Sequence, residues 1–155
     1  MKTIGKLFGF MQFLIIAMLF SGVFSFAYGQ YSGIGTFNKI TSLTDLTDGY
    51  YVIVNSGDAF AMNNTHNGTF LDSTHIKPSS GKITDPSPSI VWKIETNGSG
   101  RTIYNETTKK YVSYTGSSNN VQVVDAVSTN NQRWNITYAS NVFSIANVAL
   151  NTRIL

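Results

Sequence analysis

Three side chains that can bind a metal or transfer a proton lie close together in the sequence: His66, Asp72 and His75. Histidine and carboxylate groups are common zinc ligands and common catalytic acids and bases. Their spacing matches neither the helical pair of a metalloprotease nor a zinc knuckle. We therefore expect a solvated loop, with no catalytic residue, no metal site and no cofactor. A metal or catalytic role is the less favoured alternative.

The acidic residues offer no recognisable catalytic pair. Glycoside hydrolysis needs two carboxylates at a defined separation across a cleft, and the sequence places no two of them opposite each other. Asp48 precedes Gly49 and Asp58 follows Gly57, so turn formation explains both. The chain also lacks a G-x-S-x-G elbow, a phosphate-binding loop and any cysteine. We therefore expect a protein that is not an enzyme.

Aromatic and amide side chains are the best candidates for contact with a ligand. Tyr111 and Tyr114 lie three apart on one predicted strand, so they face opposite sides. Tyr114, beside a polar turn, is predicted to stack on a sugar ring. Asn119, Asn120 and Asn131 are predicted to bond the sugar's hydroxyl groups. The alternative is a polar turn beside a half-buried tyrosine.

A recurring spacing indicates which elements hold these residues. Trp92 and Trp134 each begin a W-x-I pattern and are 42 residues apart. An asparagine follows each of them by 13 residues, at Asn105 and Asn147. Self-similarity of this kind is the mark of a repeat architecture. The repeated position favours a core role for both tryptophans over a role as sugar platforms.

Three short strands that close on an asparagine share one inward position. They are predicted over residues 50–55, 101–105 and 142–147, with an isoleucine two before each asparagine: Ile53, Ile103 and Ile145. Residues two apart share a face of a strand, so these isoleucines are predicted to enter a common core. Second strands are predicted over residues 59–62, 110–114 and 153–155. Residues 67–89, which contain all three prolines, are predicted to be a loop insertion.

These patterns predict an all-β chain, because no helical period is sustained after residue 30. Two complete units and the start of a third predict a β-trefoil-like fold with pseudo-threefold repeats, in which six strands form a barrel and six form capping hairpins. The third repeat is predicted to be incomplete, because the third unit has no strand equivalent to the two strands that contain Trp92 and Trp134. We therefore expect a domain over residues 30–155 that is incomplete at its C-terminus, with unpaired barrel edges. The hypothesis is that the chain is an N-terminal fragment of a longer protein.

Residues 1–29 have the pattern of a signal peptide, with a basic lead, an apolar core and the small residues Ala27 and Gly29 before the expected cleavage site. The mature chain is expected to begin at Gln30. The alternative is an uncleaved anchor, since residues 7–26 are about long enough to span a bilayer. From residue 30 onward the chain contains nine Lys and Arg and eight Asp and Glu, which gives a net charge of +1. Such a surface is not expected to bind nucleic acid.

Residues 130–136 read NNQRWNI and resemble the Q-x-W signature of ricin-type β-trefoil lectins. The resemblance implies that Trp134 packs in a pseudo-threefold core and that Gln132 ties its unit together by hydrogen bonds. It also implies that Asn131 and Gln132 border a sugar site. Two positions depart from the family pattern: Ile90 stands where the first unit would carry the glutamine, and Ser113 stands where the family has a sugar-binding aspartate.

Residues 37–55 are similar to the opening of modules that follow the signal peptide in secreted proteins of Bacteroidetes-type bacteria. Such modules precede other domains, including extracellular nucleases and sorting domains, which implies an accessory role. The function expected from the whole sequence is a secreted, non-catalytic binding or accessory module whose partner is a glycan or surface polysaccharide. Contact with a membrane is not expected after cleavage. The alternative is an N-terminal accessory fragment of a secreted hydrolase or nuclease whose catalytic domain lies beyond residue 155.

Overall fold

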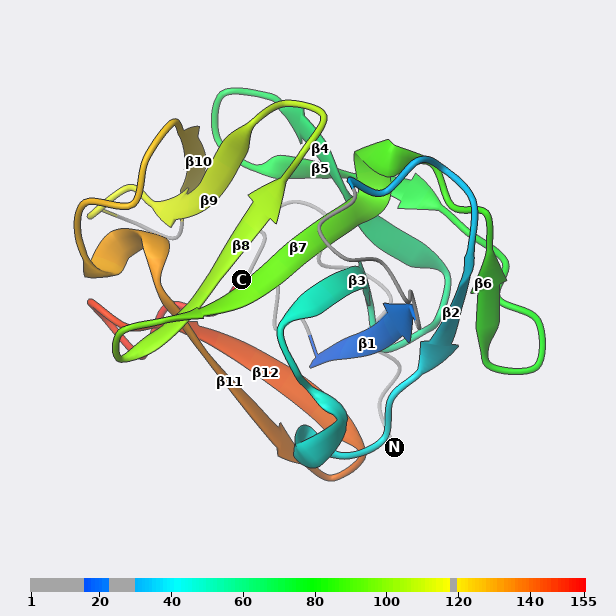
Figure 1. Ribbon diagram of the computed structural model, residues 1–155. Coiled ribbons are helices and arrows are strands. Elements are labelled where there is room, and N and C mark those ends of the chain that lie inside the picture. Colours follow the sequence, from blue (N-terminus) through cyan, green and yellow to red (C-terminus); the bar gives the residue numbers. More distant parts are fainter. Residues whose placement is uncertain (1–15, 23–29, 118–119) are drawn as a thin grey trace.

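Strands dominate the structure, a computed structural model that describes residues 16–22, 30–117 and 120–155 (Figure 1). Within these ranges twelve strands belong to one hydrogen-bonded sheet, together with three short 3-10 helices and no α-helix. The expected all-β class is confirmed. In the same ranges, no helix has the length and apolar character needed to cross a membrane.

The strands are β1 (Ile16–Gly22), β2 (Thr36–Lys39), β3 (Gly49–Val54), β4 (Phe60–His66), β5 (Leu71–His75), β6 (Lys82–Thr84), β7 (Val91–Asn97), β8 (Gly100–Asn105), β9 (Lys110–Tyr114), β10 (Val121–Val124), β11 (Trp134–Ala139) and β12 (Val142–Asn147). The 3-10 helices are η1 (Leu43–Asp45), η2 (Pro88–Ile90) and η3 (Asn130–Gln132).

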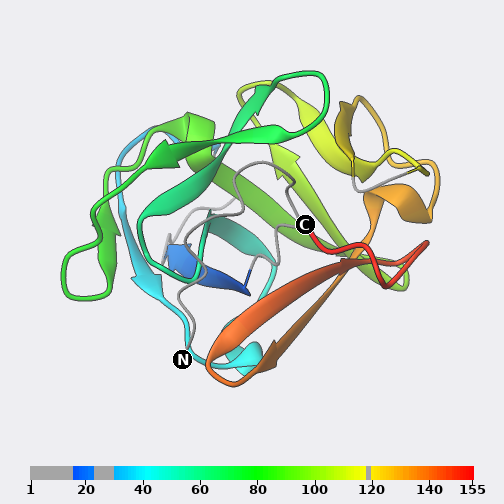
Figure 2. The same cartoon turned by 180° about the vertical axis from the view of Figure 1, so that it is seen from behind.

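Six of the strands close into a ring of antiparallel neighbours. In order around the ring, β3 pairs with β7, then β8, β11, β12 and β1, and β1 pairs with β3 again. The hairpins β4–β5 and β9–β10 continue from β3 and β8. They lie side by side when the molecule is seen from behind (Figure 2), where the Val121 N–H donates to the Thr69 carbonyl at 3.1 Å.

Both faces of β3 are buried, and each face contributes side chains to a different apolar cluster. Tyr51 and Ile53 point into the main core of the ring, whereas Val52 and Val54 pack into a second cluster on the opposite face. Alternating side chains of a strand point to opposite faces, so a continuous apolar run requires cover on both sides. Residues of β2 and β6 supply part of that cover for the second cluster, through Phe37 and Ile83.

The three strands predicted to close on an asparagine correspond to β3, β8 and β12; β8 and β12 end on their asparagines, whereas β3 ends at Val54, one residue before Asn55. Ile53, Ile103 and Ile145 are each at most 1% exposed and belong to one core cluster. Trp92 and Trp134, both 1% exposed, belong to the same cluster. The predicted core role of the tryptophans is therefore confirmed.

Two buried asparagines hold the turns at the ends of their strands. The Asn105 Nδ2 donates to the Val91 carbonyl at 3.0 Å, and the Asn147 Nδ2 donates to the Arg133 carbonyl at 3.2 Å. In each case the acceptor immediately precedes a core tryptophan. Both asparagines are 0% exposed, and a buried amide is tolerated only when its polar atoms are paired. These bonds therefore fix the ring strands to each other at one end.

Three expectations differ from the structure. Residues 67–89 are not wholly a loop, because they contain β5, β6 and the first two residues of η2. β5 buries Leu71 and β6 buries Ile83, so each strand has one apolar face that packs. Residues 153–155 do not form a full strand but a single bridge between Ile154 and Ala146. Unpaired barrel edges are expected from the sequence, whereas in the structure β3 and β12 are both bonded to β1. β1 lies within the predicted leader, whose other residues fall outside the described ranges.

Replacement of Asn147 by alanine tests the role of the buried asparagines. The Asn147→Ala variant would leave the carbonyls of Asn131 and Arg133 without their side-chain donor. We expect a loss of about 1–3 kcal/mol in the free energy of unfolding, measured by urea denaturation. The exposed Asn135→Ala variant is the control, with an expected change within about 0.5 kcal/mol. Equal losses in both variants would contradict this role.

Candidate ligand-binding face

Two of the predicted ligand-binding residues are buried. Tyr114 is 5% exposed and belongs to the main core, so its ring has no free face for a sugar. Gln132 is also 5% exposed. Its Nε2 donates to the Ser113 Oγ at 2.8 Å, and its Oε1 accepts from the Thr129 N–H at 2.8 Å. The expected hydrogen-bonding role of Gln132 is confirmed, because both its Nε2 and its Oε1 bond within the protein.

Two of the remaining predicted residues, Asn120 and Asn131, lie at the turn of the β9–β10 hairpin or close to it. Asn120 accepts the Thr115 N–H on its carbonyl at 3.3 Å. The Asn131 side chain is half-buried and approaches Gly116 in the same turn. Asn119 lies outside the described residues. Asn120 and Asn131 therefore share a neighbourhood, but the aromatic ring proposed to complete their site is in the core.

The candidate metal-binding residues are separated along the β4–β5 hairpin. His66 contacts the Val121 carbonyl through Nε2 at 2.8 Å, and Asp72 accepts from the Asn67 Nδ2 at 3.2 Å. His75 pairs with Phe60 at the other end of the hairpin, with ring centroids 5.3 Å apart. In the part of the chain that the structure describes, no three His, Cys, Asp or Glu residues form a group that could hold a metal ion.

Three tyrosines and one lysine form a row across the outer face of β3, β7, β8 and β9. Figure 1 shows these four strands as neighbours. Tyr50 of β3 is the register partner of Lys93 in β7, Lys93 is the partner of Tyr104 in β8, and Tyr104 is the partner of Tyr111 in β9. We call these four residues the tyrosine row. All four are half-buried. With neighbouring strands about 4.8 Å apart, the row is about 14 Å long.

The tyrosine rings of the row pack against neighbouring side chains. Tyr104 and Tyr111 contact each other with centroids 4.6 Å apart, tilted by 44°. Tyr50 packs against the second apolar cluster. Direct cross-strand aromatic pairs of this kind stabilise a sheet by about 0.2–1 kcal/mol each. The row is therefore a semi-rigid surface and not a set of freely rotating side chains.

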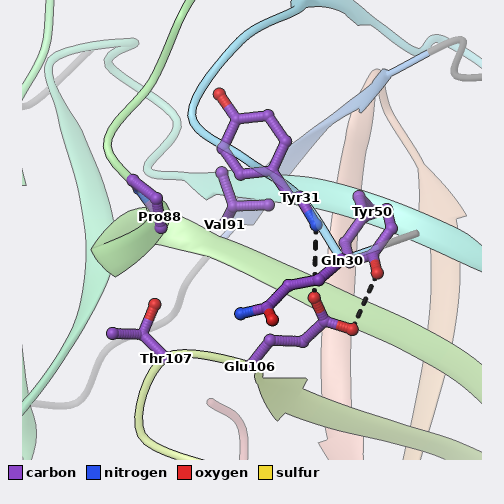
Figure 3. A pocket seen from close by; sticks show the side chains of 7 residues that line it. All are labelled: Gln30, Tyr31, Tyr50, Pro88, Val91, Glu106 and Thr107. Atoms are coloured by element: carbon purple, nitrogen blue, oxygen red, sulfur yellow. Dashed lines mark hydrogen bonds between the residues drawn. The ribbon is translucent and has the colours of Figure 1, made fainter.

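Glu106 lies at the end of the row and binds the segment that begins at Gln30 (Figure 3). Its Oε1 accepts from the Tyr50 hydroxyl at 2.7 Å, and its Oε2 accepts from the Tyr31 N–H at 3.3 Å. Burial, followed by the hydrogen bond to Glu106, raises the pKa of the Tyr50 phenol. A carboxylate oxygen can accept more than one hydrogen bond, so Glu106 retains capacity for the hydroxyl group of a ligand.

The only cation of the row is paired. Lys93 Nζ lies 2.8 Å from Glu95 Oε1, and this hydrogen bond raises the pKa of Lys93 against the opposing effect of burial. With Glu106 and Lys109 of the β8–β9 turn included, the charges of Lys93, Glu95, Glu106 and Lys109 sum to zero. The local charge is therefore compatible with a neutral ligand.

One small cavity lies at the end of the tyrosine row, and a larger depression lies away from it, at the β7–β8 turn. The pocket lined by Gln30, Tyr31, Tyr50, Pro88, Val91, Glu106 and Thr107 has a volume of about 10 Å³, which is room for about one water molecule. A larger open depression of about 260 Å³ lies between the β7–β8 turn and β11, around Gly100 and Trp134. A ligand of the row would therefore lie across the tyrosine faces and not inside a pocket.

Sequence reasoning did not select Tyr50, Lys93, Tyr104 or Glu106 as site residues. One signal was available: Tyr104 is adjacent to the inward Ile103, and Lys93 lies between the inward Trp92 and Ile94. Alternation along a strand predicts that these neighbours point outward. Their alignment in one row depends on the register between strands, which the sequence does not reveal.

Alkaline titration tests the anchoring of Tyr31. Burial, followed by the negative charge of Asp85, raises the pKa of the Tyr31 phenol from 10.0 to about 12. Between these values the folded chain holds a proton that the unfolded chain has lost, so the free energy of unfolding falls as pH rises through this range. We expect Tyr31→Phe to reduce this pH dependence, measured by urea denaturation at about pH 9 and about pH 11. The same slope in both proteins would contradict the assignment.

Comparisons with known proteins bear on the fold. No protein-family model matches the chain, and no curated protein matches it. A solved structure described as a mosquitocidal holotoxin is similar over 74% of this chain, with a TM-score of 0.58 and 21% sequence identity. The match covers 14% of the toxin chain. The all-β fold described above therefore occurs as a small part of a much larger protein.

Proposed function

We propose that this chain is a secreted, non-catalytic binding module that recognises a neutral, extended carbohydrate through the tyrosine row. The observation that carries the proposal is the alignment of Tyr50, Tyr104 and Tyr111 across neighbouring strands, with Glu106 at one end. Tyrosine rings offer apolar faces for stacking and carboxylates accept hydroxyl protons. The length of the row suits a polymer better than a small molecule.

The β-trefoil-like architecture belongs to the same proposal. Its support is the closed ring of six strands, together with matching hydrogen bonds in two of the units: each core tryptophan donates to a hairpin carbonyl, and each buried asparagine donates to the carbonyl before a tryptophan. The likeness to part of the holotoxin supports it further. The resemblance of residues 130–136 to ricin-type lectins gives a second, independent reason to consider sugar binding. The tyrosine row lies on different residues from the sugar site that this resemblance implies.

An accessory role within a longer protein is the second candidate function. The likeness spans only 14% of the holotoxin chain, so a comparable fold occurs in that protein together with other parts. In this second candidate function, residues 1–29 direct secretion, and the chain is attached to a hydrolase or nuclease domain. Absence of glycosidase and nuclease activity from this chain, together with a natural product of greater intact mass, would support it.

Binding to polysaccharides tests the tyrosine row. We expect the full chain to bind at least one insoluble neutral polysaccharide in a pull-down series or glycan array. Tyr104→Ala and Tyr111→Ala should each weaken this binding about tenfold, because each removes an aromatic stacking face. Tyr104→Phe should retain most of the affinity, since the ring face remains.

Phe60→Ala is the matched control, because Phe60 is an aromatic residue 36% exposed on β4, outside the row. It should leave binding unchanged. Circular dichroism of every variant verifies that the fold is retained. Equal loss of binding in Phe60→Ala and Tyr104→Ala, or no binding to any polysaccharide by the parent chain, would refute the carbohydrate proposal.

A further inference from the structure

β1 closes the ring, and it does so with both of its edges. One edge pairs with β3, where Met18, Leu19, Phe20 and Ser21 oppose Val54, Ile53, Val52 and Tyr51. The other edge pairs with β12, through Ile16–Ser144 and Ala17–Phe143, and further along with β2. Figure 1 shows β1 in this place between β3 and β12. Without β1, the pairings between described residues leave β3 and β12 unconnected.

The same segment lies inside the predicted leader. Residues 16–22 read IAMLFSG, and removal of residues 1–29 would take β1 out of the sheet. The residues that begin the mature chain stay attached, because the Tyr31 hydroxyl donates to the Pro86 carbonyl at 2.7 Å and the Tyr31 N–H binds Glu106. Leader removal would therefore open the ring at one defined place.

We propose that the gap between β3 and β12 is a strand-acceptor site that takes an extended apolar strand from a partner polypeptide once the leader is removed. This inference rests on the proposed secretion. In the full chain, β1 occupies the site as an internal strand. Strand addition to an exposed sheet edge is a common mode of peptide recognition.

The side chains of β3 and β12 that border the site indicate which kind of strand can bind there. On β3, Tyr51, Val52, Ile53 and Val54 are each at most 1% exposed, so both faces of that strand are covered. On β12, Phe143 and Ile145 are at most 1% exposed. A strand between them borders apolar side chains on both faces of β3 and on the inner face of β12, so a largely apolar run suits the site better than a strictly alternating one. Residues 16–22 have this composition.

The direction of the occupant is also specified. β1 is antiparallel to both β3 and β12, so a partner strand must run in the direction of β1. Two sheet edges with unpaired N–H and C=O groups are otherwise prone to uncontrolled association. The occupant gains hydrogen bonds on both edges, and this distinguishes the site from a single exposed edge strand.

Cross-linking tests the position of β1 in the full chain. Ile16→Cys with Ser144→Cys places two thiols at register partners, whereas Ile16→Cys with Thr137→Cys places them one strand further apart. Disulfide formation requires Cα atoms within about 7 Å. We expect a cross-link in the first protein and at least tenfold less in the second. Equal yields, or none in the first, would overturn the assignment of β1 to the site.

Exchange tests acceptance of a partner strand. In the full chain, residues 23–29 are replaced by the recognition sequence of a site-specific protease, and the folded protein is cut. The probe is a fluorescent peptide, IAMLFSG with flanking lysines. We expect it to bind the cut protein in place of β1, and a peptide with Ala17→Pro and Leu19→Pro to bind at least about tenfold more weakly. The uncut protein should not take up the probe.

Two outcomes of the exchange would overturn the proposal. One is release of the β1 fragment with no binding of the probe and no change in the melting temperature, because the ring would then not need a sixth strand. The other is association of cut molecules into dimers that exclude the probe, since the occupant would then be a second copy. The mass of the exported chain tests leader removal separately, so failure of secretion and failure of the site are distinguishable.

Discussion

The structure depends on two buried indole groups that join the ring to its hairpins. The Trp92 Nε1 donates to the Met62 carbonyl in β4 at 3.0 Å, and the Trp134 Nε1 donates to the Val112 carbonyl in β9 at 3.1 Å. A buried N–H without a partner costs about 1–3 kcal/mol, so each indole is stable in the core only while its hairpin is in place. Each tryptophan thus supplies apolar volume to the ring and a directional bond to the strand that covers it.

The buried asparagines extend this constraint from the hairpins to the turns. Asn105 and Asn147 each bond the carbonyl directly before a tryptophan, while their Oδ1 atoms accept N–H groups of the following turns at 3.0 Å. The end of one ring strand is therefore coupled to the start of another. Because these amides are buried, their bonds are both favourable and specific in geometry.

The candidate binding face is a consequence of the same ring. Since Trp92, Ile94 and Ile103 point inward, Lys93 and Tyr104 point outward, and the registers of β3, β7, β8 and β9 bring the outward side chains into line. The acidic Glu106 then joins the row to the segment at Tyr31. The surface proposed to bind sugar and the core that holds the fold are opposite faces of the same strands.

The sequence by itself determined the all-β class, the three strands that end on or directly before an asparagine, and the inward positions of Ile53, Ile103 and Ile145. Periodicity and repeated spacing carry this information, because they depend only on neighbours along the chain. Tertiary structure alone decided that Tyr114 is buried and that Tyr104 lines up with Tyr111 and Tyr50. It also decided that residues 16–22 pair with β3 and β12. Each of these outcomes depends on which strands pair and in what register, and residues far apart in the chain set that pairing through shared burial.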